Sequence, residues 1–324
     1  MSAVSASSQP LPAGTADGGT AVDADGAMPP RPSLAVALLR LARPKQWSKN
    51  VLVFAAPAAA GVLDNREWAI DALAAFVAFC LAAAGTYYVN DARDADADRR
   101  HPRKRHRPVA AGVVPVPLAY AGGTVLLAGA IGVSLLVNVE LALTVGGYVV
   151  LTTAYSSVLK HVAVVDLVSV AAGFVLRAVA GAAATEVPIS EWFFIVTSFG
   201  ALFMISGKRA AEAREMGDEA TDFRTVLGAY SPTYTAYLRA VTSGGMLVAY
   251  CLWAFEKADT VGDGVTVPWY QLSILPFVMA VLRYALVLDQ GRGSAPEEIV
   301  LGDRPLQLIG LAWAVVFAVG VYTA

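Results

Sequence analysis

The sequence predicts an all-α protein that crosses a membrane about nine times. Of its 324 residues, 56% are hydrophobic and only 15% are charged, and the mean hydropathy is +0.56. A soluble protein carries about 25% charged residues, so this composition excludes a soluble globular enzyme. The apolar residues also gather in runs close to the length of about 20 residues that a helix needs to cross a bilayer. We therefore expect a polytopic bundle of transmembrane helices.

Residues 1–33 differ from the rest of the chain. They are rich in Ala, Ser, Gly, Pro and Asp, contain no apolar run, and lack the basic start and apolar middle of a signal peptide. We expect a disordered cytosolic tail here, with a partner-binding arm as the alternative. Residues 33–41 then have the spacing of a short amphipathic helix, and residues 34–324 are expected to form one transmembrane domain.

Nine apolar runs are the candidate spans, with approximate bounds at residues 46–62, 67–90, 116–136, 138–156, 162–184, 190–207, 232–256, 267–288 and 304–323. The first run is short, so we expect it to be tilted or partly interfacial. Cys80 and Cys251 both lie inside apolar runs and have no metal-ligand spacing. Neither is expected to form a disulfide or to bind a metal.

The basic residues orient these spans. If the N-terminus lies in the cytosol and the spans alternate, 19 of the 24 Lys and Arg residues fall in cytosolic segments. The exceptions are Arg66, Lys257, Arg177, Arg239 and Arg283. By the positive-inside rule, this bias predicts a multi-pass plasma-membrane protein whose N-terminus and active site are cytoplasmic. The formal net charge of −2 hides this basic face. Its bases alternate with acids at a membrane surface, so nucleic acid is a disfavoured partner.

The most informative motif follows the second apolar run, where residues 90–98 read NDARDADAD. If the helix continues, Asp91, Asp94 and Asp98 lie on one face, and Asn90 begins an overlapping stripe with i, i+4, i+8 spacing. Clustered carboxylates destabilise a helix unless they are neutralised. Mg²⁺ prefers oxygen ligands and is often held by one or two carboxylates together with substrate phosphates. A Mg²⁺ site is the hypothesis here, and a solvated charged loop is the alternative.

Basic residues come directly after these acids. Residues 101–108 read HPRKRHRP and supply Lys104, Arg105 and Arg107. Acid beside base at a membrane surface indicates a metal–phosphate site. Tyr87 lies one turn before the acidic motif and could bond a phosphate or a ribose hydroxyl. Its alternative role is that of a tyrosine in the interfacial aromatic belt.

Two further motifs carry cations on the same face. In RPKQWSKN, residues 43–50, Lys45 and Lys49 have i, i+4 spacing and would bind either a substrate phosphate or anionic lipid headgroups. In YSSVLKH, residues 155–161, Lys160 lies in a short cytosolic turn. Asp166 follows, either as a metal ligand or as the partner of Lys160. Arg177 lies three turns deeper and is expected to form a structural ion pair.

The last cationic motif ends the sixth run, where residues 207–212 read GKRAAE. Lys208 and Glu212 have i, i+4 spacing, and the fork of Arg209 suits bidentate phosphate recognition. The charged residues 297–304 are expected to be structural. No Ser-His-Asp, Cys-His, HExxH, P-loop or GxGxxG arrangement has the context that its chemistry requires.

These motifs together resemble the UbiA superfamily of intramembrane prenyltransferases. NDARDADAD matches the pattern ND-x-x-D-x-x-x-D after the second helix, HPRKRHRP continues the match, and YSSVLK resembles the Tyr and Lys motif after helix four. The resemblance covers nearly all of residues 34–324 and implies a UbiA-like transferase domain with nine helices and bound Mg²⁺.

The second motif of the family is missing, because GKRAAE stands where members that use prenyl diphosphates carry a DxxxD pair. Asp218 and Asp222 satisfy that pattern ten residues later, which we treat as chance. With RPKQWSKN and APEEIVLGDRPLQ, the chain resembles a branch that transfers 5-phosphoribose from phosphoribosyl diphosphate (PRPP) to polyprenyl (decaprenyl) phosphate for cell-wall arabinan synthesis in actinobacteria. The resemblance therefore implies a Mg²⁺-dependent phosphoribosyltransferase, a kind of pentosyltransferase.

The resemblance also implies roles for individual residues. Those in the metal and catalytic group are Asn90 and Asp94 as Mg²⁺ ligands, with Asp91 and Asp98 as further ligands or their support. Tyr87 and Tyr155 are expected to bind substrate. The leaving diphosphate would be bound by Lys104, Arg105 and Arg107, and the 5-phosphate by Lys208 and Arg209, with Glu212 beside them. The candidates for binding the lipid phosphate are Lys45, Lys49 and Lys160. The acceptor is already an anion, so no general base is required.

Two other functions stay open. One is a UbiA-type prenyltransferase that joins a polyprenyl diphosphate to an aromatic acceptor. The other is a transporter of a phosphorylated lipid or small anion, which should carry charges near mid-membrane on broken helices. The crowding of charges on one face favours an enzyme. The length of the lipid, the formation of a homo-oligomer and the match of each acid to a metal ion are not determined by the sequence.

Overall fold

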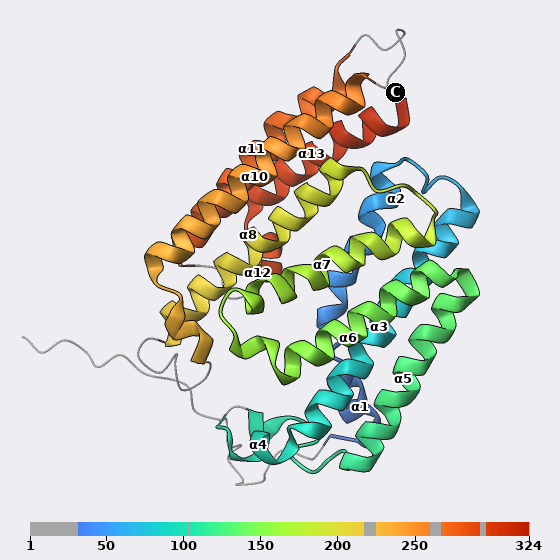
Figure 1. The fold of residues 1–324 in the computed structure, drawn as a ribbon, viewed down its shortest axis with the longest axis vertical. Coiled ribbons are helices and arrows are strands. Elements are labelled where there is room, and N and C mark those ends of the chain that lie inside the picture. The colour runs from blue at the N-terminus through green and yellow to red at the C-terminus, as the bar shows by residue number, and fades with distance from the viewer. Residues whose placement is uncertain (1–31, 103, 217–224, 260–266, 292–295, 324) are drawn as a thin grey trace, which may run out of the picture.

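The computed structural model describes residues 32–323 except 103, 217–224, 260–266 and 292–295, and every regular element in them is a helix (Figure 1). The predicted all-α class is confirmed. Most of the expected N-terminal tail, residues 1–31, lies outside the described residues, as do Arg103, Asp218 and Asp222. The amphipathic helix α1 (Leu34–Ala42) begins at Ser33, whose hydroxyl accepts a hydrogen bond from the backbone of Val36.

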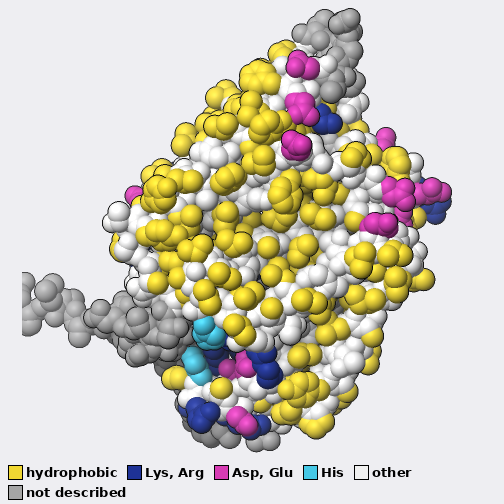
Figure 2. Space-filling view, in the orientation of Figure 1, with side chains coloured by type: hydrophobic (Ala, Val, Ile, Leu, Met, Phe, Trp, Pro, Cys, Tyr) yellow, Lys and Arg dark blue, Asp and Glu magenta, His cyan; other side chains and the backbone are white. Residues whose placement is uncertain are grey.

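Eight of the described helices are long and apolar enough to cross a membrane. They are α3 (Arg66–Arg93), α5 (Val116–Val137), α6 (Val139–Ser157), α7 (Val165–Ala184), α8 (Glu191–Met216), α10 (Pro232–Asp259), α11 (Trp269–Asp289) and α13 (Arg304–Thr323). Shorter elements join them: α4 (Ala95–Arg100), η2 (Lys104–His106), η3 (Leu159–His161), η5 (Thr225–Ala229) and α12 (Pro296–Gly302). In the space-filling view, hydrophobic side chains cover the middle of the molecule and charged ones lie towards its ends (Figure 2). The chain is an integral membrane protein.

The first expected span has a different form from the other eight. Residues 46–62 do not form one long α-helix, because the chain folds there as the 3₁₀-helix η1 (Pro44–Phe54) followed by the short α2 (Ala55–Ala59). A 3₁₀-helix rises about 2.0 Å per residue, so η1 and α2 together reach about 30 Å, close to the thickness of the hydrocarbon core. The tighter helix covers this length with fewer residues than an α-helix would need.

A glycine in α7 allows η1 to pack against that helix. A Cβ atom added at Gly181 would lie 1.7 Å from the carbonyl oxygen of Val53. No side chain larger than hydrogen fits at this crossing.

The helices form two groups. The first holds α3, α5, α6 and α7, with η1 packed against α3 and α7, and the second holds α8, α10, α11 and α13 (Figure 1). Contacts between α7 and α8 join the groups, and at the far end the turn after α2 meets α13, where a Cβ at Gly61 would lie 2.8 Å from Val321. The short helix α4 marks one end of the bundle, which we call the α4 end.

Candidate active site

The acidic motif lies at the α4 end, at the junction of α3 and α4. The backbone N–H of Asp94 donates to Asn90 at 2.9 Å, and that of Asp98 donates to Asp94 at 2.8 Å. These bonds keep the i, i+4 geometry of an α-helix although Asp94 itself interrupts the helix. The predicted helical spacing of the motif is therefore present in the structure.

Two arginines neutralise the buried acids of the motif. Arg107 donates from Nη1 to Asp98 Oδ2 at 2.8 Å and to Asp91 Oδ1 at 3.2 Å, and Arg43 donates from Nη2 to the same Asp91 oxygen at 2.8 Å. Asp91 and Asp98 are each only 3% exposed. The clustered acids need neutralising charge, and at these two acids it comes from Arg43, 48 residues before Asp91, and from Arg107 in the segment that follows α4.

The role of Arg43 is not evident from the sequence. Arg43 joins α1 to η1 in the left-handed conformation, with φ at 51°, which is uncommon for a residue with a side chain. Its guanidinium lies 4.3 Å from the ring centroid of Tyr87 and also binds Asp91. Backbone strain at a binding site is a frequent sign of function. Tyr87 is therefore part of this cluster and not only a tyrosine at the membrane interface.

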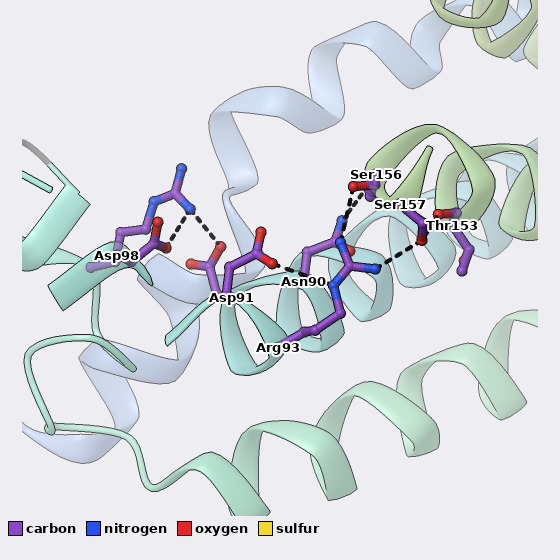
Figure 3. A network of polar contacts seen from close by, with 9 residues as sticks. Asn90, Asp91, Arg93, Asp98, Thr153, Ser156 and Ser157 are labelled. Atoms are coloured by element: carbon purple, nitrogen blue, oxygen red, sulfur yellow. Dashed lines mark hydrogen bonds and ion pairs between the residues drawn. The ribbon is translucent and has the colours of Figure 1, made fainter. Parts of the chain in front are cut away.

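Asn90 and Asp94, which the sequence predicts as Mg²⁺ ligands, are held differently. Asn90 donates from Nδ2 to Ser156 Oγ at 3.0 Å, which leaves its oxygen Oδ1 as an acceptor (Figure 3). Asp94 has a 38% exposed side chain, and its contact with Arg93 Nε is 3.3 Å long. Arg93 in turn donates to Ser157 Oγ at 3.0 Å. Of Asn90, Asp91, Asp94 and Asp98, it is therefore Asn90 and Asp94 that keep oxygen atoms open to a ligand.

These two donors suit Mg²⁺ that arrives with a substrate. Within the described part of the chain, no group of three or more His, Cys, Asp or Glu side chains is arranged to hold a metal. Mg²⁺ commonly takes one or two protein ligands and completes its shell with phosphate oxygens and water. One carboxylate and one amide oxygen a helical turn apart match that pattern.

A second polar cluster surrounds Arg209 on α8, which is 3% exposed. Arg209 binds Asp166 through two bonds, from Nε to Oδ2 at 2.9 Å and from Nη2 to Oδ1 at 3.1 Å. Its Nη1 donates to Glu212 Oε2 at 2.6 Å, and Tyr155 donates to Asp166 at 2.8 Å. The sequence suggested a metal ion or Lys160 as the partner of Asp166 and did not indicate this ion pair with Arg209. Lys208 is more open, at 33% exposed, with its Nζ 3.8 Å from Glu212.

The YSS motif connects the two clusters. Tyr155 touches both Asp166 and Arg209, while its neighbour Ser156 accepts from Asn90. Consecutive residues at the end of α6 therefore bind one cluster each. The two halves of the bundle meet in a single site at the α4 end.

The start of α7 is tied to this site by Tyr230. The backbone N–H of Val164 donates to the Tyr230 hydroxyl at 2.9 Å, and Val164 has φ at 67°, a strained value for a β-branched residue. Burial raises the pKa of Tyr230, so its hydroxyl stays neutral. The strained turn places Asp166 beneath Arg209.

The remaining predicted residues lie around these clusters. Lys104 and Arg105 are exposed on η2, which packs against α4. Lys45 is exposed at the start of η1, and Lys49 is half-buried and donates to Gln46. Lys160 is half-buried in η3. Because η2 packs against α4, its cations lie close to the acidic motif.

The predicted ion pair of Arg177 is wrong. In the described residues no carboxylate forms an ion pair with it. It donates instead to Asn50 Oδ1 at 2.8 Å, to the Tyr148 hydroxyl at 3.1 Å and to the carbonyl of Gly173 at 2.5 Å. The sequence places Arg177 in the membrane but does not indicate that its partners, which come from η1, α6 and α7, are neutral.

The chain belongs to the UbiA prenyltransferase family, whose model matches residues 50–301. Its curated relatives include a decaprenyl-phosphate phosphoribosyltransferase of Corynebacterium glutamicum, 43% identical over 94% of this chain and 92% of that protein. The protein with the same name from Mycobacterium tuberculosis is 42% identical over 88% of this chain and 94% of its own length.

Solved structures agree on the fold. A UbiA homolog from Archaeoglobus fulgidus, bound to GPP and Mg²⁺, superposes with a TM-score of 0.65 at 18% identity, over 88% of this chain and 99% of that chain. The structure of digeranylgeranylglyceryl phosphate synthase gives a TM-score of 0.63 at 15% identity, over 90% and 99% of the two chains. The predicted UbiA-like fold is confirmed.

Proposed function

We propose that this chain transfers 5-phosphoribose from phosphoribosyl diphosphate to a polyprenyl phosphate and releases diphosphate. The observation that carries the proposal is the cluster of Lys208 and Arg209 at the end of α8, in a family whose usual second motif is acidic. Relatives 41–43% identical to this chain bear the name decaprenyl-phosphate phosphoribosyltransferase, which supports it. The product would be a precursor for cell-wall arabinan.

The donor diphosphate would be held at the acidic motif. Asn90 Oδ1 and the Asp94 carboxylate are the proposed Mg²⁺ ligands, and Mg²⁺ would supply charge that stabilises the leaving diphosphate. Asp91 and Asp98 act by fixing Arg107, which retains N–H groups for a phosphate oxygen. Lys104 and Arg105, both exposed on η2, add positive charge that would help to bind the departing diphosphate.

The 5-phosphate of the donor would bind the second cluster. Lys208, one-third exposed, is the residue proposed to contact it. Arg209 has most of its donors committed to Asp166, Tyr155 and Glu212, so its main contribution is to position this end of α8 and keep it positively charged. Tyr87, stacked on Arg43, lies on the α3 side of the ribose.

The chemical step needs no base. An oxygen anion of the lipid phosphate forms a bond to C1 of the ribose as the bond from C1 to the diphosphate oxygen breaks, and the diphosphate keeps the electron pair. Positioning and electrostatic stabilisation of the leaving group then account for catalysis.

The site would face the cytoplasm, where a soluble sugar phosphate is available. This orientation rests on the basic residues that gather at the α4 end. Ala111 is exposed in the loop before α5. An Ala111→Cys variant without the two native cysteines should react with a membrane-impermeant thiol reagent in inverted vesicles and not in intact cells. Labelling in intact cells would overturn the orientation.

One assay tests the reaction. Purified full-length protein is given Mg²⁺ with either PRPP and decaprenyl phosphate, or decaprenyl diphosphate and 4-hydroxybenzoate, and the lipid product is identified by mass. We expect a phosphoribosylated lipid only from the first pair, and EDTA should abolish it reversibly. A prenylated aromatic product from the second pair, without the first product, would overturn the proposal.

A further inference from the structure

We propose that Arg177 binds the phosphate of the lipid acceptor. This inference rests on the proposed function, and it concerns a residue deep in the bundle, outside both clusters at the α4 end. Three observations carry it: the lack of a counter-charge, the free donors of the guanidinium, and its direction relative to Tyr87.

The first observation is the uncompensated charge. Arg177 lies within the span α7 and is 7% exposed. Its described polar partners are the side chains of Asn50 and Tyr148 and the carbonyl of Gly173, all of them neutral. Three rings surround it, with the guanidinium carbon 4.8 Å from the centroid of Tyr148 and 5.6 Å from those of Phe79 and Phe174. Arginine does not lose its proton in proteins, and a buried cation in a membrane is a functional site by default. An anionic ligand would complete this arrangement.

The second observation is the hydrogen-bonding capacity of the side chain. A guanidinium has five N–H donors in a planar fork. The bonds to Asn50, Tyr148 and Gly173 use one donor on each of its three nitrogens. Nη1 and Nη2 therefore each keep a second N–H, and a guanidinium can donate such groups to two phosphate oxygens. The three protein bonds hold this fork in place before a ligand arrives.

The third observation is direction. The chain passes along α3 towards the α4 end and returns along α7 away from it (Figure 1). Side chains on a helix tilt towards its N-terminus, so Tyr87 on α3 leans into the membrane while Arg177 on α7 leans towards the α4 end. On α3 itself, the ring centroid of Phe79 lies 5.6 Å from the guanidinium carbon of Arg177, and Tyr87 follows about two turns nearer the α4 end, just before Asn90. Tyr87 thus lies between the acidic motif and Arg177.

This order suits the two substrates. The donor diphosphate would lie at Asn90 and Asp94, the ribose near Tyr87, and the acceptor phosphate one level deeper at Arg177. A lipid phosphate that enters from the bilayer meets the deep cation first, and its oxygen then faces C1 on the side opposite the leaving diphosphate. Lys49, next to Asn50 on the half-buried part of η1, is a second cation near the same level.

The test compares two lipids that differ only in the phosphate. Binding of decaprenyl phosphate and of decaprenol is measured on the purified full-length protein, on Arg177→Gln, and on Arg239→Gln as a control arginine in another span. We expect the unmodified protein to prefer the phosphate. Arg177→Gln should lose about tenfold or more of its affinity for decaprenyl phosphate while its affinity for decaprenol is kept, and Arg239→Gln should bind both lipids as the unmodified protein does.

Other outcomes separate the possibilities. If Arg177→Gln is folded and keeps the preference for the phosphate, or loses both lipids equally, the inference is overturned. Arg177→Lys serves if the glutamine variant does not fold, because it retains charge without the fork. The lysine variant should then prefer decaprenyl phosphate over decaprenol less strongly than the unmodified protein does. An unchanged preference would overturn the inference. A preference that depends on Arg177 in a protein that transfers no phosphoribose would contradict only the proposed function. Binding of PRPP with Mg²⁺ should be the same in all variants.

Discussion

The two polar clusters at the α4 end neutralise charge in opposite ways. Around Asp91, two arginines bind the two buried carboxylates, and the more open Asn90 and Asp94 keep oxygen atoms for a ligand. Around Arg209, one buried guanidinium is enclosed by acids, and the open group beside it is the ammonium of Lys208. The first cluster therefore presents oxygen to a cation, and the second presents a cation to an anion. In the proposed reaction, the first cluster would serve a metal ion and the second would serve a phosphate directly.

The largest effect on activity is expected at the first cluster. Asp94→Ala removes the proposed carboxylate ligand and should lower kcat/KM by about 100-fold or more, because loss of a metal ligand removes the charge that stabilises the leaving group. Stability should change little, since Asp94 is 38% exposed. Turnover and thermal unfolding are measured on the same preparation.

Asp96→Ala is the matched control, because Asp96 lies in the same motif and is 88% exposed with Arg99 as its partner. Near-normal activity is expected for it. Equal loss of activity in both variants would show that the motif acts only through its total charge.

In the second cluster, substitution of Asp166 should lower the free energy of unfolding more than it changes the chemical step. Asp166→Asn leaves Arg209 without its bidentate partner, and breaking a buried ion pair costs about 3–5 kcal/mol. Thermal or denaturant unfolding in detergent measures the loss. Arg99→Gln breaks an exposed pair instead and should cost less than about 1 kcal/mol. If Asp166→Asn is as stable as Arg99→Gln, the network around Arg209 does not hold α8 in place.

A smaller effect, an increase in stability, is expected at the turn that precedes Asp166. Val164 has φ at 67°, so Val164→Gly should relieve strain and raise stability by up to about 1 kcal/mol. Unfolding curves of the two proteins test this. A loss of activity with that gain would indicate that the strain helps to position Asp166, whereas a loss of stability would contradict the presence of strain.

The sequence predicted those features that depend on local pattern. Apolar runs locate the eight long helices because their length follows from bilayer thickness, and the spacing of residues 90–98 follows from the helix alone. The form of η1 was missed. It depends on the contact of Val53 with Gly181, more than a hundred residues away, and no local pattern reports such a contact.

The partners of the buried charged residues also could not be predicted from local sequence patterns. The sequence places Arg43, Arg107 and Asp91 near one membrane face, but it does not show that both arginines bind Asp91. Arg177 was expected to find an acid because most buried arginines do, and its neutral partners come from three separate elements. Pairing across the bundle is set by tertiary packing, so it becomes visible only in the structure.

Selectivity for the 5-phosphate of the donor tests the difference between the clusters most directly. The measurement compares kcat/KM for PRPP with that for ribose 1-diphosphate, which lacks this phosphate, in the unmodified protein, in Lys208→Gln, and in Arg214→Gln as a control for charge on α8. We expect the unmodified protein and Arg214→Gln to prefer PRPP strongly, and Lys208→Gln to lose about tenfold or more of that preference while its KM for the lipid is unchanged. An unchanged preference in Lys208→Gln, or a change confined to the KM for the lipid, would contradict the assignment of the second cluster to the donor phosphate.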